Sequence, residues 1–175
     1  GAAAYTIDQS CRFDDGDSAY LSKTFASGGN RQTWTFSCWV KRANLLSSGV
    51  DSYDALFAPS TDGAFTFAYN DFSFYDGITN GWSLTTDRKF RDSAAWYHIV
   101  GVVDTTNATA GDRIRIWVNG ERQTSFSAEV YPSEDLEGKW NNNIAHNVGT
   151  HSGSGYWLDG YMAEAHFLDG TVAEA

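Results

Sequence analysis

Short stretches of this chain alternate between hydrophobic and polar residues, as β-strands with one buried face do. The clearest stretch is residues 112–126, DRIRIWVNGERQTSF, in which Ile, Ile and Val point one way and Arg, Arg and Trp point the other. Asn119 and Gly120 follow this strand, and both residues tolerate positive φ. We therefore expect a type I′ turn and a return strand over residues 121–126.

The segment before it, WYHIVGVVD at residues 96–104, leaves hardly any polar face. This pattern predicts a central strand that is covered on both sides. Residues 33–41, TWTFSCWVK, alternate again and place Trp, Phe, Cys and Val on one face. A covered strand beside half-exposed strands is typical of the middle of a two-sheet sandwich.

The remaining segments are short and are separated by turn residues. Asp15, Gly16 and Asp17 stand between two strand-like segments, which predicts a strand, a turn and a second strand over residues 10–22. Residues 127–143 form the longest irregular stretch, and residues 87–95 have room for a single helical turn. Further strands are expected at residues 55–58, 64–70, 72–76, 81–86, 144–149, 156–159 and 161–168. So many short strands predict an all-β protein, an antiparallel two-sheet β-sandwich of the jelly-roll type.

The composition agrees with one all-β domain. The 175 residues include 7 Trp, 9 Tyr and 11 Phe but only 2 Pro, and few windows hold apolar residues at helical spacing. We assign residues 9–172 to the domain, residues 1–8 to a linker or cloning remnant, and residues 173–175 to a tail. Because the sequence stops directly after a strand, we expect a module of a longer protein.

Charge and hydropathy narrow the possible partners. The formal net charge is −10, and no basic face is visible, so nucleic acid is not expected as a ligand. No apolar run is long enough to predict membrane insertion, and the first residues lack the features of a signal peptide. The acidity favours solubility, or it provides aspartates that bind Ca²⁺ from loops.

Several segments resemble the laminin G-like, concanavalin A-like jelly roll. W-Y-H-I-V-G-V-V-D followed by I-W-V-N-G-E carries the resemblance, with F-D-D-G-D-S-A-Y-L and F-S-C-W-V-K-R before it and L-D-G-Y-M-A-E-A-H-F-L-D-G after it. The resemblance covers about residues 9–172, and the matching segments are most similar in sequence to domains of bacteriophage tail and other virion proteins. The resemblance implies two antiparallel sheets, one of them concave, and most often a glycan-binding or adhesive role without catalysis.

From this resemblance we expect a non-catalytic carbohydrate-binding and adhesion module of a phage virion protein. Such a module would work on the virion, outside the cell, with a host-surface glycan as ligand and neighbouring virion subunits as further partners. Two alternatives stay open. One is a structural module that only contacts those subunits, and the other is a glycan-degrading enzyme.

An enzyme of this fold would need paired carboxylates. Laminarinase-type glycosidases carry a Glu-x-Asp-x-x-Glu string on one strand, and this chain has no such string. It also lacks a Ser-His-Asp pattern, a phosphate loop and a zinc motif. We therefore predict no catalytic residue.

Candidate ligand residues are loop aromatics with polar neighbours, because sugar rings stack on flat aromatic faces and amides bind their hydroxyls. We expect Trp82, Trp140 or Trp157 to be exposed and to provide the main surface. Tyr156, beside Trp157, belongs to the same group of loop aromatics. Each of these residues could instead pack in the core. The predicted ligand-binding residues are Tyr53, Tyr75, Asn80, Trp82, Trp140, Asn142, His151 and Trp157.

Asp14, Asp15 and Asp17 form the tightest acidic group of the chain. Some relatives in the family that the chain resembles hold Ca²⁺ at a sandwich edge through loop carboxylates, which suit this hard cation. A calcium site at these three residues is one interpretation, and turn formation by Asp side chains is the other. If calcium binds, we expect it to act on the acidic loops and not on the fold.

Cys11 and Cys38 are the two cysteines, and both lie on the hydrophobic side of an alternating strand. They either form a disulfide or remain two buried thiols. Assembly of a phage protein in a reducing cytoplasm favours thiols, whereas use outside the cell favours the bond.

Overall fold

The computed structural model describes residues 6–45, 53–60, 62–79, 81–153 and 155–174. These residues form two antiparallel sheets and one short 3-10 helix, η1 (Ala110–Asp112). One sheet contains β1 (Cys11–Phe13), β3 (Thr33–Arg42), β8 (Tyr97–Asp104), β9 (Ile114–Val118), β10 (Glu121–Arg122) and β13 (Gly160–Asp169). The other contains β2 (Leu21–Thr24), β4 (Tyr53–Pro59), β5 (Gly63–Ala68), β6 (Asp71–Asp76), β7 (Trp82–Thr86), β11 (Phe126–Val130) and β12 (Ala145–Val148).

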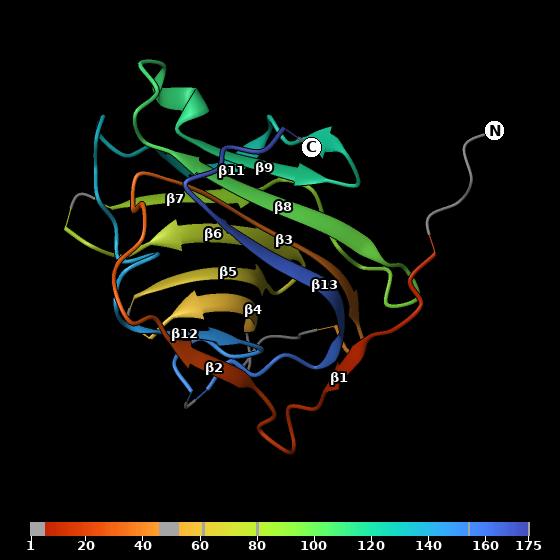
Figure 1. Cartoon of the computed structure of the whole chain (residues 1–175). Helices are drawn as coiled ribbons and strands as arrows, with labels where there is room; N and C mark the ends of the chain where they lie inside the picture. Colours follow the sequence, from red (N-terminus) through yellow and green to blue (C-terminus); the bar gives the residue numbers. More distant parts are fainter. Residues whose placement is uncertain (1–5, 46–52, 61, 80, 154, 175) are drawn as a thin grey trace.

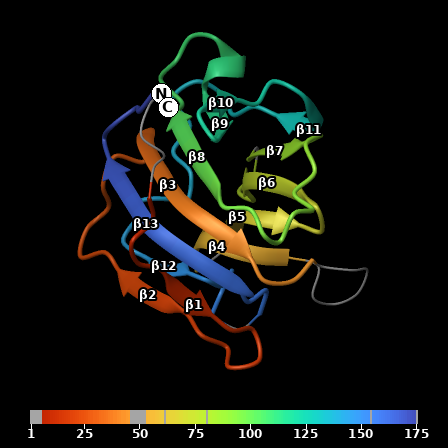
Figure 2. The ribbon, with the colours of Figure 1, turned by 90° about the vertical axis from the view of Figure 1, so that its right-hand side faces the viewer.

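The two sheets lie face to face, as the views in Figures 1 and 2 show. The six-stranded sheet has the order β1-β13-β3-β8-β9-β10, and the seven-stranded sheet has the order β11-β7-β6-β5-β4-β12-β2. Strands that follow one another in the chain are neighbours in the sheet from β4 to β7. At β1, β2, β11, β12 and β13, in contrast, the chain passes to the other sheet or to a distant position in the same sheet. The predicted all-β, two-sheet jelly roll is therefore confirmed.

The core between the sheets consists mainly of aromatic rings. The Trp34 ring stacks on Trp140 at 5.1 Å between centroids, and the Phe36 ring stacks on Phe57 at 4.4 Å. Trp34 and Phe36 are the alternating hydrophobic residues of β3, and both are buried. The alternation in the sequence thus predicted the inner face of this strand correctly.

The central strand is also as the sequence predicts. β8 lies between β3 and β9, and both of its faces are largely buried. Val100 and Val102 lie on its outer face and form a small second cluster with Trp117. The turn after β9 has φ of 53° at Asn119 and 78° at Gly120, the sign that a type I′ turn requires.

The strand, turn and strand expected over residues 10–22 are present as β1, a turn and β2, but the two strands do not form a hairpin. The turn is present, since the N–H of Ser18 donates to the carbonyl of Asp15. However, β1 pairs with β13 and β2 pairs with β12, so the flanking strands belong to different sheets. Phe13 is buried between the sheets, and the chain crosses the sandwich immediately after it. A turn motif fixes a local reversal of the chain but not which strands pair.

Smaller expectations also need correction. The return strand over residues 121–126 pairs with β9 only at β10, and the chain then joins the other sheet as β11, which pairs with β7. Part of the stretch expected to be irregular is therefore a strand. Residues 92–95 form one hydrogen-bonded turn but no helix, and residues 156–159 form a loop and not a strand.

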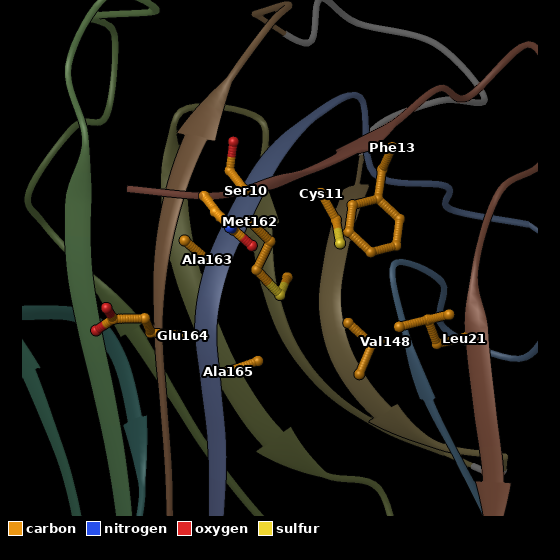
Figure 3. A pocket seen from close by; sticks show the side chains of 10 residues that line it. Ser10, Cys11, Phe13, Leu21, Val148, Met162, Ala163, Glu164 and Ala165 are labelled. Atoms are coloured by element: carbon orange, nitrogen blue, oxygen red, sulfur yellow. The ribbon is translucent and has the colours of Figure 1, made fainter. Parts of the chain in front are cut away.

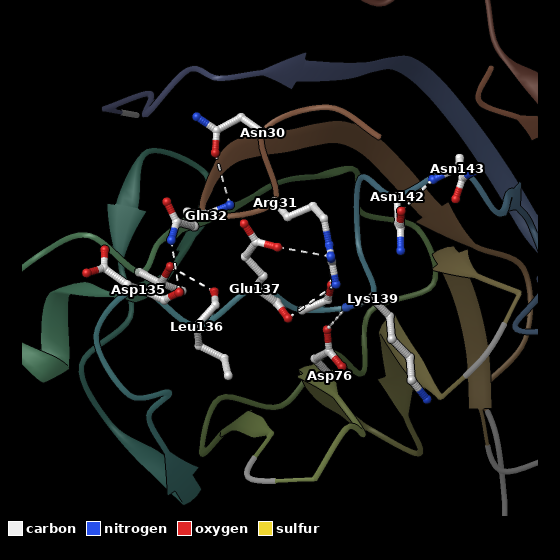
Figure 4. A network of polar contacts seen from close by, with 12 residues as sticks. Asn30, Arg31, Gln32, Asp76, Asp135, Leu136, Glu137, Lys139, Asn142 and Asn143 are labelled. Atoms are coloured by element: carbon white, nitrogen blue, oxygen red, sulfur yellow. Dashed lines mark hydrogen bonds and ion pairs between the residues drawn. The ribbon is translucent and has the colours of Figure 1, made fainter. Parts of the chain in front are cut away.

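A polar network fixes the long segment between β11 and β12 (Figure 4). A carboxylate oxygen of the buried Asp76 accepts a hydrogen bond from the backbone N–H of Lys139 at 2.7 Å. On the same segment, Glu137 forms an ion pair with Arg31 at 3.0 Å. These contacts hold Trp140, the next residue after Lys139, in the core.

Candidate ligand-binding site

The tryptophans expected to be exposed are mostly buried. Trp82 is 3% exposed and Trp140 is 1% exposed, so their assignment as ligand-stacking residues is wrong. Trp82 lies on the inner face of β7, perpendicular to the Phe74 ring, and the indole N–H of Trp140 donates to the carbonyl of Tyr75. Both side chains are core because tryptophan fills large spaces between sheets.

The other predicted residues separate into two groups. Trp157 is half-buried against the Tyr20 ring, and Asn142 bonds to the backbone N–H of Asn143, so neither lines the cavity described next. Asn80 lies outside the described residues. Tyr53, Tyr75 and His151, in contrast, do come together in space.

These three residues and Tyr156 enclose a cavity of about 220 Å³ on the outer face of the seven-stranded sheet. Its remaining lining residues are small, namely Ala55, Ala64 and Thr66. We call this site the tyrosine–histidine cavity. It combines four aromatic rings with a shallow floor of short side chains.

The register of the strands explains the shape of this cavity. Ala55 of β4 pairs with Thr66 of β5, while Tyr53 and Tyr75 pair with β5 residues on either side of Thr66. Residues two apart on a strand point to the same face, so these side chains all point outward. The two tyrosines therefore stand at opposite corners, and the small floor residues lie between them.

The loop between β12 and β13 supplies His151 and Tyr156. The N–H of Ala55 donates to the carbonyl of Tyr156 at 3.2 Å, which ties the loop to β4. Within the loop, the hydroxyl of the fully buried Thr150 donates to the carbonyl of Gly155 at 2.7 Å. These bonds fix the loop over the sheet and leave Tyr156 42% exposed.

The rings meet at different angles. Tyr53 lies edge-to-face with Tyr156 at 5.1 Å, and Tyr156 is nearly perpendicular to His151 at 5.8 Å. His151 and Tyr75 are nearly parallel, with 3.3 Å between the imidazole Nε2 and the phenol oxygen. The rings thus present faces and edges around the cavity rather than one stacked column.

Burial sets the protonation of the polar groups. It raises the pKa of Tyr75 to about 12, with smaller contributions from Tyr53, Asp62 and Tyr156. It lowers the pKa of His151, against the charge of Asp62, which raises it. At neutral pH the cavity therefore offers the uncharged phenol of Tyr75 and the uncharged imidazole of His151, and each of them can donate and accept hydrogen bonds.

A second cavity, of about 230 Å³, opens between the sheet edges at β1, β13 and β2 (Figure 3). Its walls are mostly aliphatic side chains and Phe13, with Glu164 and Ser10 among the few polar lining residues. It lacks the several exposed aromatic faces that sugars stack on. This slot is therefore the weaker candidate for a glycan.

The aspartates proposed as calcium ligands make local contacts. Asp14 Oδ1 accepts a hydrogen bond from the N–H of Gly16, and Asp14 Oδ2 lies 3.4 Å from the Arg12 guanidinium. Among the described residues, no group of three or more His, Cys, Asp and Glu side chains converges in a way that could hold a metal ion. The calcium site at Asp14, Asp15 and Asp17 therefore stays a prediction.

The two cysteines are free, so the predicted disulfide is wrong for this structure. Cys11 pairs with Met162 of β13, which pairs in turn with Val40 of β3, two residues from Cys38. Two strand spacings separate β1 from β3, about 10 Å, which is too far for a bond. Cys38 is buried in the core, and Cys11 is exposed at the slot shown in Figure 3.

Solved structures with the same fold come from varied sources. The mouse laminin alpha1 chain, domains LG4-5, matches with a TM-score of 0.64 and 8% identity over 99% of this chain and 47% of that chain. The Botulinum neurotoxin serotype G binding domain matches with a TM-score of 0.58 and 10% identity over 99% of this chain and 45% of that chain. This chain thus spans about half the length of those two proteins.

A third similar structure is the Ruminococcus gnavus IT-sialidase CBM40 bound to alpha2,3 sialyllactose. It matches with a TM-score of 0.54 and 11% identity over 89% of this chain and 94% of that chain. At these identities the likeness concerns the fold alone. No curated protein matches the chain by sequence.

Within the part of the chain that the structure describes, no helix is long and apolar enough to cross a membrane.

A laminin G-type family model, described as the concanavalin A-like lectin/glucanases superfamily, matches residues 14–175. Together with the two-sheet architecture, this match shows that the chain belongs to that superfamily.

Proposed function

We propose that this chain is a non-catalytic carbohydrate-binding module and that the tyrosine–histidine cavity is its ligand site. The carrying observation is the convergence of Tyr53, Tyr75, His151 and Tyr156 over a floor of small side chains. Aromatic faces stack on the C–H groups of a sugar, while phenols and an imidazole bind its hydroxyls. The volume of about 220 Å³ is smaller than the sites of drug-sized ligands and suits one sugar ring.

The similar structures support the class of function. They include a Botulinum neurotoxin binding domain and the CBM40 bound to alpha2,3 sialyllactose. Because they share only the fold with this chain, they support a binding module and not a particular ligand.

Catalysis is disfavoured by the chemistry of the cavity. A retaining glycosidase needs two carboxyl groups about 5 Å apart beside the scissile bond. Among the described residues that line the tyrosine–histidine cavity, none is Asp or Glu. A glycan-degrading enzyme would have to use a different surface.

The wider role that we propose rests on the sequence resemblance to phage domains. In this role the module is part of a virion tail or surface protein, binds a host-surface glycan outside the cell, and contacts neighbouring virion subunits. The competing structural role would require only the subunit contacts. Glycan binding is the property that separates the two.

A glycan array with the purified chain, in Ca²⁺ and in EDTA, tests the proposal. We expect at least one bound glycan and at least tenfold weaker binding by Tyr53→Ala and Tyr156→Asn. Asn is chosen because Tyr156 has a φ of 55°, which Asn tolerates. Tyr161→Ala, at a 38% exposed tyrosine of the other sheet, is the matched control.

Two results would contradict the proposal. No binding to any glycan in either buffer would favour the structural role. Full binding by Tyr53→Ala and Tyr156→Asn would place the ligand elsewhere. Melting temperatures within a few degrees of wild type would show that these variants remain folded.

A further inference from the structure

The tyrosine–histidine cavity carries no charge of its own. Its lining consists of Tyr, His, Ala and Thr, and burial lowers the pKa of His151, so the imidazole is neutral near pH 7. Asp62 is the charged residue that acts on both Tyr75 and His151. The Nζ of Lys139 lies 3.6 Å from the Asp62 carboxylate, and the Asp62 side chain is 74% exposed. Asp62 is therefore the charge that favours a cation at the cavity, and Lys139 offsets part of it.

The charge of Asp62 disfavours an acidic sugar. Carboxylates and sulfates on glycans are bound by Arg or Lys through charge-assisted hydrogen bonds. None of the described residues that line the cavity is Arg or Lys. The formal net charge of −10 adds a repulsion at longer range. A sialylated or sulfated sugar would enter this cavity without a counter-charge.

The ring geometry suits a cation instead. The π-face of an aromatic ring attracts an ammonium group placed within about 6 Å of its centroid. Tyr53 meets Tyr156 at an interplanar angle of 79°, and Tyr156 meets His151 at 84°. Rings at such angles surround a small space from several sides. The phenol oxygens additionally accept hydrogen bonds from an ammonium N–H.

We propose that the tyrosine–histidine cavity selects a sugar residue with a positively charged amino group, that is, a hexosamine without its N-acetyl group. This inference rests on the proposed carbohydrate-binding function and specifies its ligand class. The sugar ring stacks on the tyrosines, and the ammonium lies among the ring faces on the side biased by Asp62.

Isothermal titration calorimetry with two matched tetrasaccharides tests the inference. One is β-1,4-linked glucosamine and the other is its fully N-acetylated form, which has the same backbone without the charge. We expect the amino form to bind at least tenfold more tightly at low salt, with the preference shrinking as salt is added. Asp62→Asn should reduce the preference two- to threefold. Asp92→Asn, which removes a carboxylate that does not act on Tyr75 or His151, should leave it unchanged.

Each outcome separates the inference from the proposed function. Equal or tighter binding of the N-acetylated tetramer would overturn the cationic preference and leave carbohydrate binding intact. The same holds if neither tetramer binds while another glycan on the array binds through Tyr53 and Tyr156. A preference that survives in Tyr156→Asn and Tyr53→Ala would place the cation elsewhere. Failure of every glycan to bind would overturn both.

Discussion

A buried ion pair lies in the core directly behind the candidate site. Arg42 and Asp54 are 0% and 1% exposed in their side chains, with 3.2 Å between Nη2 and Oδ2. Arg42 also donates to the carbonyl of Phe90 and lies over the Phe67 ring. Burial raises the pKa of Asp54 to about 6, against the opposing charge of Arg42. The pair is costly to desolvate, so each charge depends on the other.

Replacing Arg42 tests this dependence. Arg42→Met leaves the Asp54 carboxylate unpaired and should lower the free energy of unfolding at pH 7 by about 3–5 kcal/mol. The pKa of Asp54 in the folded variant then lies even further above its unfolded value. The folded state therefore binds the proton more tightly, and stability rises as the pH falls through that pKa.

Urea unfolding at pH 7 and pH 5 measures the effect. Part of the loss in Arg42→Met should be recovered at pH 5. The control Lys89→Met breaks the exposed pair with Asp71 and should cost less than about 1 kcal/mol. A loss of equal size at both pH values would show that Asp54 does not titrate.

His151 predicts a pH dependence of ligand binding. Burial lowers its pKa, so the neutral imidazole persists at pH 7 and is protonated only as the pH falls through a value below about 6.5. Protonation makes the Nε2 of His151 a donor only, so that it can no longer accept a hydrogen bond from the Tyr75 hydroxyl, and it places a charge among the rings. Affinity should thus be present above pH 6.5 and be lost below it.

Calorimetric titration from pH 5 to pH 8 with a glycan from the array checks this expectation. His151→Gln keeps a polar side chain but cannot titrate, so its affinity should vary much less over this range. If the variant and the wild type show the same loss at low pH, another group is responsible.

At the level of elements, β8 and β5 approach each other closely. A Cβ added at Gly101 would lie 2.5 Å from a carbon of the Phe65 ring and 3.0 Å from Phe74. The position therefore requires glycine for the close packing of the two sheets. Gly111 gives a matched comparison, since a Cβ there would meet nothing within 4 Å.

The substitution Gly101→Ala should lower the free energy of unfolding by about 1–3 kcal/mol, because extra atoms in a packed core force the rings to shift. Gly111→Ala should change stability much less. Thermal unfolding of both variants makes the comparison. Equal melting temperatures would mean that the sheets can separate without cost.

The sequence predicted single strands well and their partners poorly. β3, β8 and β9 were predictable because side-chain alternation reports directly which face is buried. The pairing of β1 with β13 was not, because it joins residues at opposite ends of the chain. No local sequence pattern shows which sheet a short strand joins or which strand it pairs with.

The candidate site shows the same limit. Tyr53, Tyr75 and His151 were identifiable as aromatic or imidazole side chains with polar neighbours, but their convergence depends on the register of β4, β5 and β6 and on the β12–β13 loop. Trp82 and Trp140 have equally polar sequence neighbours. They are core because the space between the sheets needs large apolar rings, which only the three-dimensional packing reveals.

At the scale of the molecule, the sandwich is held by an aromatic core without a disulfide in the structure. Cys38 is fully buried, and burial raises the pKa of its thiol, so the reactive thiolate is suppressed. Cys11 is exposed. The two thiols should therefore differ in reactivity.

Thiol titration without reductant should give one reactive thiol per folded chain and two per denatured chain. Cys11→Ser should remove the thiol that reacts in the folded state. No titratable thiol in the denatured protein would instead mean that Cys11 and Cys38 are oxidised.

The central claim is that a glycan binds in the tyrosine–histidine cavity. The most direct test is an NMR titration of the isotope-labelled chain with a glycan from the array. We predict that the largest shifts occur at Tyr53, Thr66, Tyr75, His151 and Tyr156, while signals of Leu21 and Met162 at the apolar slot stay unchanged. Shifts confined to the slot, or to the outer face of the six-stranded sheet, would contradict the assignment.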